Sequence, residues 1–110
     1  MKRISLHEEI EADLDRIWSW IAIEQGAPES AGRVLDAIET GFRLIARHPG
    51  VGHLRWKHPP ELSDIRMLLV PRYHNYLVFY REAPDQVEIV AIIHGKRDLP
   101  HRLLETGRFE

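Results

Sequence analysis

The chain has 110 residues, the usual size of one domain and too short for two. Hydrophobic residues make up 44% and charged residues 29% of the sequence, a globular balance that excludes an intrinsically disordered chain. The formal net charge of -2 argues against dependence on many phosphate contacts, because proteins of that kind carry a clear basic excess. We therefore expect one domain, residues 1–110, that does not bind DNA directly by itself.

Cysteine is absent, which excludes disulfides and thiolate metal sites and fits a reducing compartment. No apolar run approaches the length of a membrane span, and the segment Met1–Ile4 lacks the apolar core of a signal peptide. The sequence thus predicts a cytoplasmic protein that makes no contact with a membrane.

The N-terminal half predicts one strand and two helices. Residues 2–7 alternate polar and apolar side chains, as a short strand at or near a sheet edge does. Apolar residues then recur at helical spacing over residues 7–25 and again over residues 27–48. Because the connection is short, the two helices should form an antiparallel hairpin. We expect Gly41 to allow close packing of the second helix against the first.

Two tryptophans in the first predicted helix cannot both face the core, because residues two apart do not share a helix face. Trp18 falls on the apolar stripe, so we expect it in the core. Trp20 lies about 100° away from that stripe by helix geometry, so we expect it to be partly exposed. An exposed tryptophan either contacts another chain or packs at the edge of the fold.

The C-terminal half predicts a sheet. Residues 51–62 include two consecutive prolines and predict a long loop, followed by strands at residues 64–70, 76–82 and 86–94. Short connections imply an antiparallel meander. The last of these strands is apolar on both alternating sets, which is typical of a strand buried on both faces inside a sheet. A short helix should start near Leu99.

These elements predict an α+β fold in the order β-α-α-β-β-β, with a helical hairpin on one face of an antiparallel sheet and a short C-terminal helix. One hairpin can cover one face only. The second face is too apolar for solvent, so a partner or the C-terminal tail should cover it.

Four segments form a specific combination: ADLDRIWSWIA in the first helix, LIARHPGVGHLR in the loop, DIRMLLVPRYHNYLVFYR in the strands, and VEIVAIIHGKRDL at the end. Together they resemble the ParE branch of the ParE/RelE toxin superfamily over nearly the whole chain. The resemblance implies the toxin of a type II toxin-antitoxin pair, held in a hetero-oligomer with a cognate antitoxin. In that family a largely helical antitoxin segment wraps the toxin and lies in its groove.

Members similar to ParE inhibit DNA gyrase, and members similar to RelE cut messenger RNA on the ribosome; the fold alone does not decide between them. An RNA-cleaving site needs a base, an acid and cations for the phosphate, and Arg66, Arg81 and His94 are the candidates. RelE-like nucleases usually carry a basic overall charge, which this chain lacks. The resemblance therefore favours a gyrase inhibitor that acts by protein contact, without a catalytic step or a cofactor. A ribosome-dependent mRNA endonuclease and a degenerate, non-toxic antitoxin-binding member are the alternatives.

Five residues are the candidates for contact with the target or the antitoxin. Arg72 and Tyr73 fall in the turn between two strands, and Tyr73 is favoured because aromatic residues are enriched at interface centres. Lys96 and Arg97 belong to HGKRD, which is either a contact segment or a solvated turn before the last helix. Trp20 is expected to contact a second toxin copy or the antitoxin.

Structural roles compete with the functional ones. Arg66 leads its strand among apolar neighbours, so an ion pair with an acid of the first helix, such as Asp13, is the alternative to catalysis. His94 ends the last strand and could be a general acid or base, or a hydrogen-bonded structural residue. Three histidines share residues 48–58 but lack helical spacing and a cysteine, so we expect no metal site.

Overall fold

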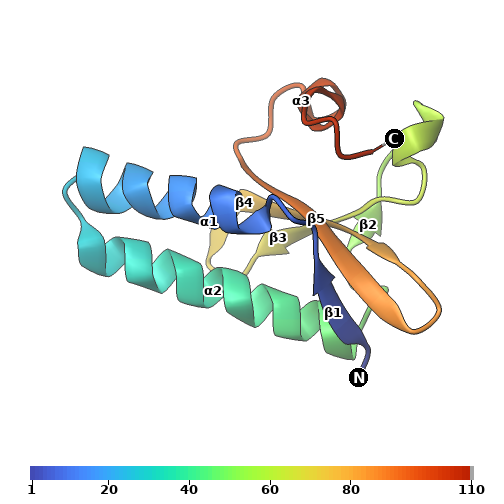
Figure 1. Cartoon of the computed structure of the whole chain (residues 1–110), viewed down its shortest axis with the longest axis horizontal. Coiled ribbons are helices and arrows are strands. Elements are labelled where there is room, and N and C mark those ends of the chain that lie inside the picture. The colour runs from blue at the N-terminus through green and yellow to red at the C-terminus, as the bar shows by residue number, and fades with distance from the viewer. Residues whose placement is uncertain (110) are drawn as a thin grey trace.

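The computed structural model describes residues 1–109. It consists of a helical hairpin, a sheet and a C-terminal helix (Figure 1). In chain order the elements are β1 (Arg3–Leu6), α1 (Ile10–Ser19), the π-helical turn η1 (Trp20–Glu24), α2 (Pro28–Arg47), β2 (His53–Leu54), the 3-10 turn η2 (Pro60–Leu62), β3 (Arg66–Val70), β4 (Tyr73–Glu82), β5 (Gln86–His94) and α3 (Leu99–Glu105).

The five strands form one mixed sheet in the order β1-β5-β4-β3-β2. The expected antiparallel meander is present, with β5 as an internal strand and β1 at an edge. However, β1 pairs with β5 in parallel, and Ile4 lies opposite Val87. Tight turns force neighbouring strands to be antiparallel, whereas β1 and β5 are separated by most of the chain, so no turn sets their relative direction.

Two strand boundaries differ from the sequence prediction. The expected loop over residues 51–62 contains β2, which adds two residues to the edge of β3. Two residues are too few to produce a detectable alternation. The turn before β4 is also tighter than expected, because Arg72 takes a left-handed conformation, with φ of 71°, and the strand resumes at Tyr73.

A β-bulge interrupts the pairing of β4 with β5. Phe79 lies opposite Ala91, whereas Tyr80 lies opposite Ile89, so Val90 is the extra residue. Val90 and Ala91 both pack in the cluster beneath the C-terminal tail, and Ile92 returns to the cluster beneath the helices.

The buried stripe of α1 and η1 does not include Trp18, which the sequence pattern placed on it. It runs through Ile10, Asp13, Ile17 and Ile21, with a carboxylate at a core-facing position. Trp18 follows Ile17 and is rotated away from the sheet, so its side chain is 40% exposed. The prediction that Trp18 lies in the core is therefore wrong.

The second helix packs on the sheet through Gly41. A Cβ at this position would lie 3.5 Å from Leu68 Cδ2 and 3.9 Å from Pro71 Cδ. The close approach that we expected toward the first helix is instead an approach to β3 and its following turn, because Gly41 is on the face of α2 that meets the sheet.

Two apolar clusters lie on opposite faces of the sheet. The hairpin and the sheet form the first cluster, which includes Val78 and Ile89. The C-terminal segment covers the second face, where Leu99, Leu103 and Phe109 pack against β-strand residues such as Phe79. The sequence allowed either a partner or the C-terminal tail to cover this second face, and the structure shows the tail there.

Tyr80 holds the HPGVG segment against the sheet. Its hydroxyl donates a hydrogen bond to the carbonyl of Pro49 at 2.6 Å and accepts one from the Gly52 N–H at 2.8 Å. A Cβ on Gly52 would approach the Tyr80 ring to 2.8 Å, so only glycine fits. Burial raises the pKa of Tyr80, partly offset by the hydrogen bond from Gly52, and burial also raises the pKa of Tyr76.

These tyrosines should make the protein less stable in alkaline solution. An unfolded tyrosine has a pKa of about 10, so it loses its proton before the buried ones do. The stabilisation is complete below that pH and is lost as the pH rises toward the folded-state pKa. Urea unfolding between neutral pH and about pH 11 should therefore show a smaller decline in Tyr80→Phe than in the native chain. Equal declines in both proteins would contradict this assignment.

Candidate functional site

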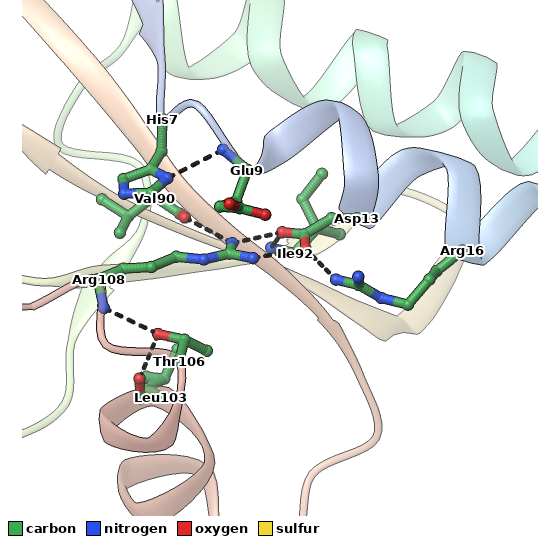
Figure 2. Close-up of polar contacts among 9 residues, drawn as sticks. All are labelled: His7, Glu9, Asp13, Arg16, Val90, Ile92, Leu103, Thr106 and Arg108. Carbon is green, nitrogen blue, oxygen red and sulfur yellow. Dashed lines mark hydrogen bonds and ion pairs between the residues drawn. The ribbon is translucent and has the colours of Figure 1, made fainter.

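A buried carboxylate joins α1, β5 and the C-terminal tail (Figure 2). Asp13 is 3% exposed, and its Oδ2 accepts the Ile92 N–H at 3.2 Å and Arg108 Nη1 at 2.7 Å. Oδ1 accepts Arg108 Nη2 at 2.8 Å and a further bond from Arg16. The hydrogen bond to Asp13 raises the pKa of Arg108, so this guanidinium stays charged.

These side chains occupy the open edge of β5. The β1 strand pairs with β5 only as far as Ile89, and within residues 1–109 the rest of β5 has no strand on that side. Arg108 donates to the Val90 carbonyl at 3.0 Å, and Arg102 donates to the His94 carbonyl at 2.8 Å. Three charged side chains therefore supply hydrogen bonds that a neighbouring strand would otherwise make.

A groove of about 500 Å³ follows this edge. Its walls come from α1 with η1, from the end of β5, and from α3. The lining residues are Asp13, Arg16, Ile17, Trp20, Tyr76, Ile92, Ile93, His94, Arg102, Glu105 and Thr106.

The groove combines an apolar floor with cationic walls. The Tyr76 and His94 rings lie with their centroids 4.7 Å apart, and Ile92 continues this surface. Arg108 and Arg16 both bind Asp13, so the negative charge of this carboxylate is balanced. Arg102 donates hydrogen bonds to backbone carbonyls. Glu105, the other acid of the lining, lies 2.7 Å from His101. The groove therefore suits a partner that offers apolar and acidic groups.

The structure brings the five predicted contact residues to one region. The Gly95 N–H donates to the Asn75 carbonyl at 2.8 Å, so the turn with Arg72 and Tyr73 lies at the same end of the sheet as Lys96 and Arg97. We call these four residues the basic end of the sheet. Trp20, which is 52% exposed, lines the adjacent groove.

The cations of the basic end are available to a partner. Arg72, Lys96 and Arg97 are exposed, and none forms an ion pair within residues 1–109. Tyr73 is partly buried against the cluster beneath the helices. The arrangement is a partly buried aromatic residue at the same end of the sheet as three exposed cations.

The three residues that a nuclease would need do not converge. Arg66 is on the helix side of β3, where it donates to the Gly52 carbonyl at 2.8 Å and lies 3.6 Å from Glu82. The expected ion pair of Arg66 with Asp13 is wrong, because Arg108 and Arg16 bind Asp13. Arg81 is on the opposite face, where its guanidinium carbon lies 5.9 Å from the Phe109 ring centroid. His94 is at the far end of β5, opposite Tyr76.

Over residues 1–109, no group of three or more His, Cys, Asp or Glu side chains could hold a metal ion. In the same residues, no helix is long and apolar enough to cross a membrane.

The sequence analysis named Trp20 and His94, which line the groove, but it did not identify Asp13, Arg102 and Arg108 as residues of this site. Asp13 gave a signal, because an acid stands on the apolar stripe between Ile10 and Ile17. Such an acid is buried only if a cation reaches it. Arg102 and Arg108 gave none, because no periodic pattern encodes where α3 and the tail after it lie relative to the sheet.

The chain is a small α+β protein with a helical hairpin on a mixed sheet and a groove along the edge of β5. Residues 4–99 match the family model described as the ParE toxin of the type II toxin-antitoxin system parDE. The chain therefore belongs to the ParE toxin family.

The chain is also similar to one curated toxin and to one solved structure. Toxin RelE3 of Caulobacter vibrioides is 28% identical over 95 residues, which cover 86% of this chain and 96% of that protein. The solved chromosomal ParDE toxin-antitoxin system from P. aeruginosa has a chain with the same fold. Its TM-score is 0.69 and its identity 21%, over 87% of this chain and 98% of that one.

Removal of the Asp13 carboxylate should destabilise the fold strongly. In Asp13→Ala the Arg108 guanidinium, whose side chain is 8% exposed, would remain buried without its counter-ion. Loss of one partner of a buried ion pair costs about 3–5 kcal/mol. Asp15→Ala, which removes an exposed acid of the same helix, is the matched control and should change the free energy of unfolding by less than about 0.5 kcal/mol. Equal urea midpoints for the two variants would refute the structural role of Asp13.

Proposed function

We propose that this ParE-family toxin inhibits DNA gyrase by protein contact and that a cognate antitoxin neutralises it. The proposal involves no catalytic step. The basic end of the sheet is the proposed contact with gyrase, and the groove beside it is part of the antitoxin site.

The observation that carries the proposal is the clustering at the basic end. Tyr73 shares one end of the sheet with three cations that form no ion pair within residues 1–109. Arginine and aromatic residues are enriched among the residues that dominate binding energy. The candidate nuclease residues are instead divided between two faces and two ends of the sheet. General acid-base cleavage requires its groups within hydrogen-bond reach of one phosphate. Their separation supports inhibition by contact.

A second candidate function rests on a specific observation. The relative from Caulobacter vibrioides is named Toxin RelE3, and RelE-like toxins are the mRNA-cleaving branch of the superfamily. A ribosome-dependent endonuclease is therefore the alternative, with Arg66, Arg81 and His94 as the residues to test. The degenerate, non-toxic member is the third possibility.

Two assays on one preparation separate these functions. Purified toxin should block supercoiling by gyrase and leave messenger RNA intact on translating ribosomes. Cleaved message with normal supercoiling would establish the endonuclease instead. Growth that continues during expression of the toxin alone would indicate the degenerate member.

Removal of charge from the basic end should weaken gyrase inhibition. We expect the Lys96→Ala, Arg97→Ala double variant to need at least tenfold more protein for half-inhibition, because two interface contacts of about 0.7 kcal/mol each are lost. Arg43→Ala is the control, since Arg43 is exposed on α2 and pairs with Glu39 at 2.8 Å. Similar inhibition by both variants would place the gyrase contact elsewhere.

The two exposed tryptophans provide a matched test of the antitoxin site. Trp20 lines the groove, whereas Trp18 is similarly exposed but does not line it. Trp20→Ala should raise the dissociation constant of the antitoxin complex about tenfold or more, while Trp18→Ala changes it little. Circular dichroism and thermal unfolding of the free toxins would show that both remain folded. An unchanged affinity for Trp20→Ala would remove Trp20 from the interface.

A further inference from the structure

We propose that Arg102 is a positioning residue for the gyrase contact, because it holds the loop of residues 94–98 in the conformation that presents Lys96 and Arg97. The inference rests on the proposed function, in which the basic end of the sheet contacts gyrase. Arg102 acts through the loop backbone and makes no contact with gyrase itself.

The first argument is that Arg102 joins two parts of this loop. Its Nη2 donates a hydrogen bond to the His94 carbonyl at 2.8 Å, and its Nη1 donates one to the Arg97 carbonyl at 3.4 Å. A Cβ on Gly95 would lie 3.4 Å from the same Nη1, so the guanidinium packs closely on the loop backbone. The rigid fork of a guanidinium is suited to binding two acceptors at once. One side chain thus ties the beginning of the loop to its end.

The second argument is that the backbone of the loop is unusual. Gly95 has a φ of 96° and Asp98 has a φ of 50°, so both residues lie in the left-handed region. A residue other than glycine is uncommon there. The Gly95 N–H donates to the Asn75 carbonyl at 2.8 Å, which fixes the start of the loop against β4. The guanidinium of Arg102 extends this support from the start of the loop to Arg97.

The third argument is that Arg102 is itself anchored in the core. It lies in α3 between Leu99 and Leu103, which are 4% and 0% exposed and pack on the second face of the sheet. Its backbone N–H donates to the Asp98 carbonyl at 2.9 Å. The guanidinium therefore reaches the loop from a fixed point of the fold.

The order of the loop matters for binding, because ordering a segment costs entropy. Lys96 and Arg97 form no ion pair within residues 1–109, so the loop backbone sets where their side chains begin. A contact segment that is ordered before binding loses less conformational entropy when the complex forms. Loss of the Arg102 guanidinium should therefore weaken gyrase inhibition although no contact with gyrase is removed.

The test is a double-mutant cycle in the gyrase supercoiling assay. Arg102→Ala should raise the toxin concentration for half-inhibition about fivefold, because the loop must then be ordered on binding. In the Lys96→Ala, Arg97→Ala background the same change should raise it by less than about twofold, since the residues that Arg102 positions are already absent. His101→Ala, which removes an exposed side chain of the same helix, is the control and should inhibit like the native toxin. Equal increases in the two backgrounds would overturn the proposal.

Arg102→Lys separates positioning from a direct charge contact. Lysine keeps the positive charge, but its ammonium lacks the planar fork that binds the two carbonyls. We expect Arg102→Lys to lose as much inhibition as Arg102→Ala. Native inhibition by Arg102→Lys would instead assign Arg102 a charge contact with gyrase, and the positioning role would be wrong.

The order of the loop can also be measured without gyrase. In NMR relaxation of the free toxin, the backbone order parameters of Lys96 and Arg97 should fall in Arg102→Ala and keep their native values in His101→Ala. The amide of Val78, in the middle of β4, is the internal reference for an intact fold.

The two measurements distinguish failure of this inference from failure of the proposed function. Unchanged order parameters at Lys96 and Arg97 overturn the positioning role, whatever the supercoiling assay shows. Native toxin that leaves supercoiling intact refutes the proposed function and, with it, the gyrase part of the inference. In that case the order parameters still decide whether Arg102 holds the loop.

Discussion

The fold depends on one ion pair between residues that are far apart in the sequence. Burial of Asp13 costs free energy, because a carboxylate leaves water, and this cost is offset only when several donors surround it. Here Arg108, Arg16 and the Ile92 N–H together provide four hydrogen bonds. The same contact fixes the first helix, the edge of β5 and the C-terminal tail relative to one another.

The layers on both faces of the sheet are coupled through this contact. The tail carries Leu103 and Phe109 over the second apolar face, and Arg108 reaches past the edge of β5 to the carboxylate on the helix side. The groove has α1 as one wall and α3 as the other, so its width depends on the ion pair that spans the same edge. A structural interaction thereby sets the geometry of the groove.

Much of the architecture could be predicted from the sequence, because hydrophobic periodicity and turn residues are local signals. The hairpin, the meander, the internal position of β5 and the start of α3 at Leu99 all follow from such signals. The parallel direction of β1, the rotation of Trp18 out of the core and the packing of Gly41 on the sheet depend on distant contacts. For the same reason the candidate contact residues could be named, but Arg102 and Arg108 could not. Their roles arise from where the tail returns to the sheet.

The separation of these contacts along the chain also has a consequence for synthesis. Residues of β1 pair with residues of β5 that come more than eighty positions later, and Asp13 pairs with Arg108, which comes 95 positions later. During synthesis, α1 leaves the ribosome long before the residues that complete its buried contact. Until Arg108 has emerged from the exit tunnel, the Asp13 carboxylate lacks its counter-ion and the groove lacks the wall that α3 forms. A partner that requires the finished groove must therefore recognise chains from which residue 108 has emerged.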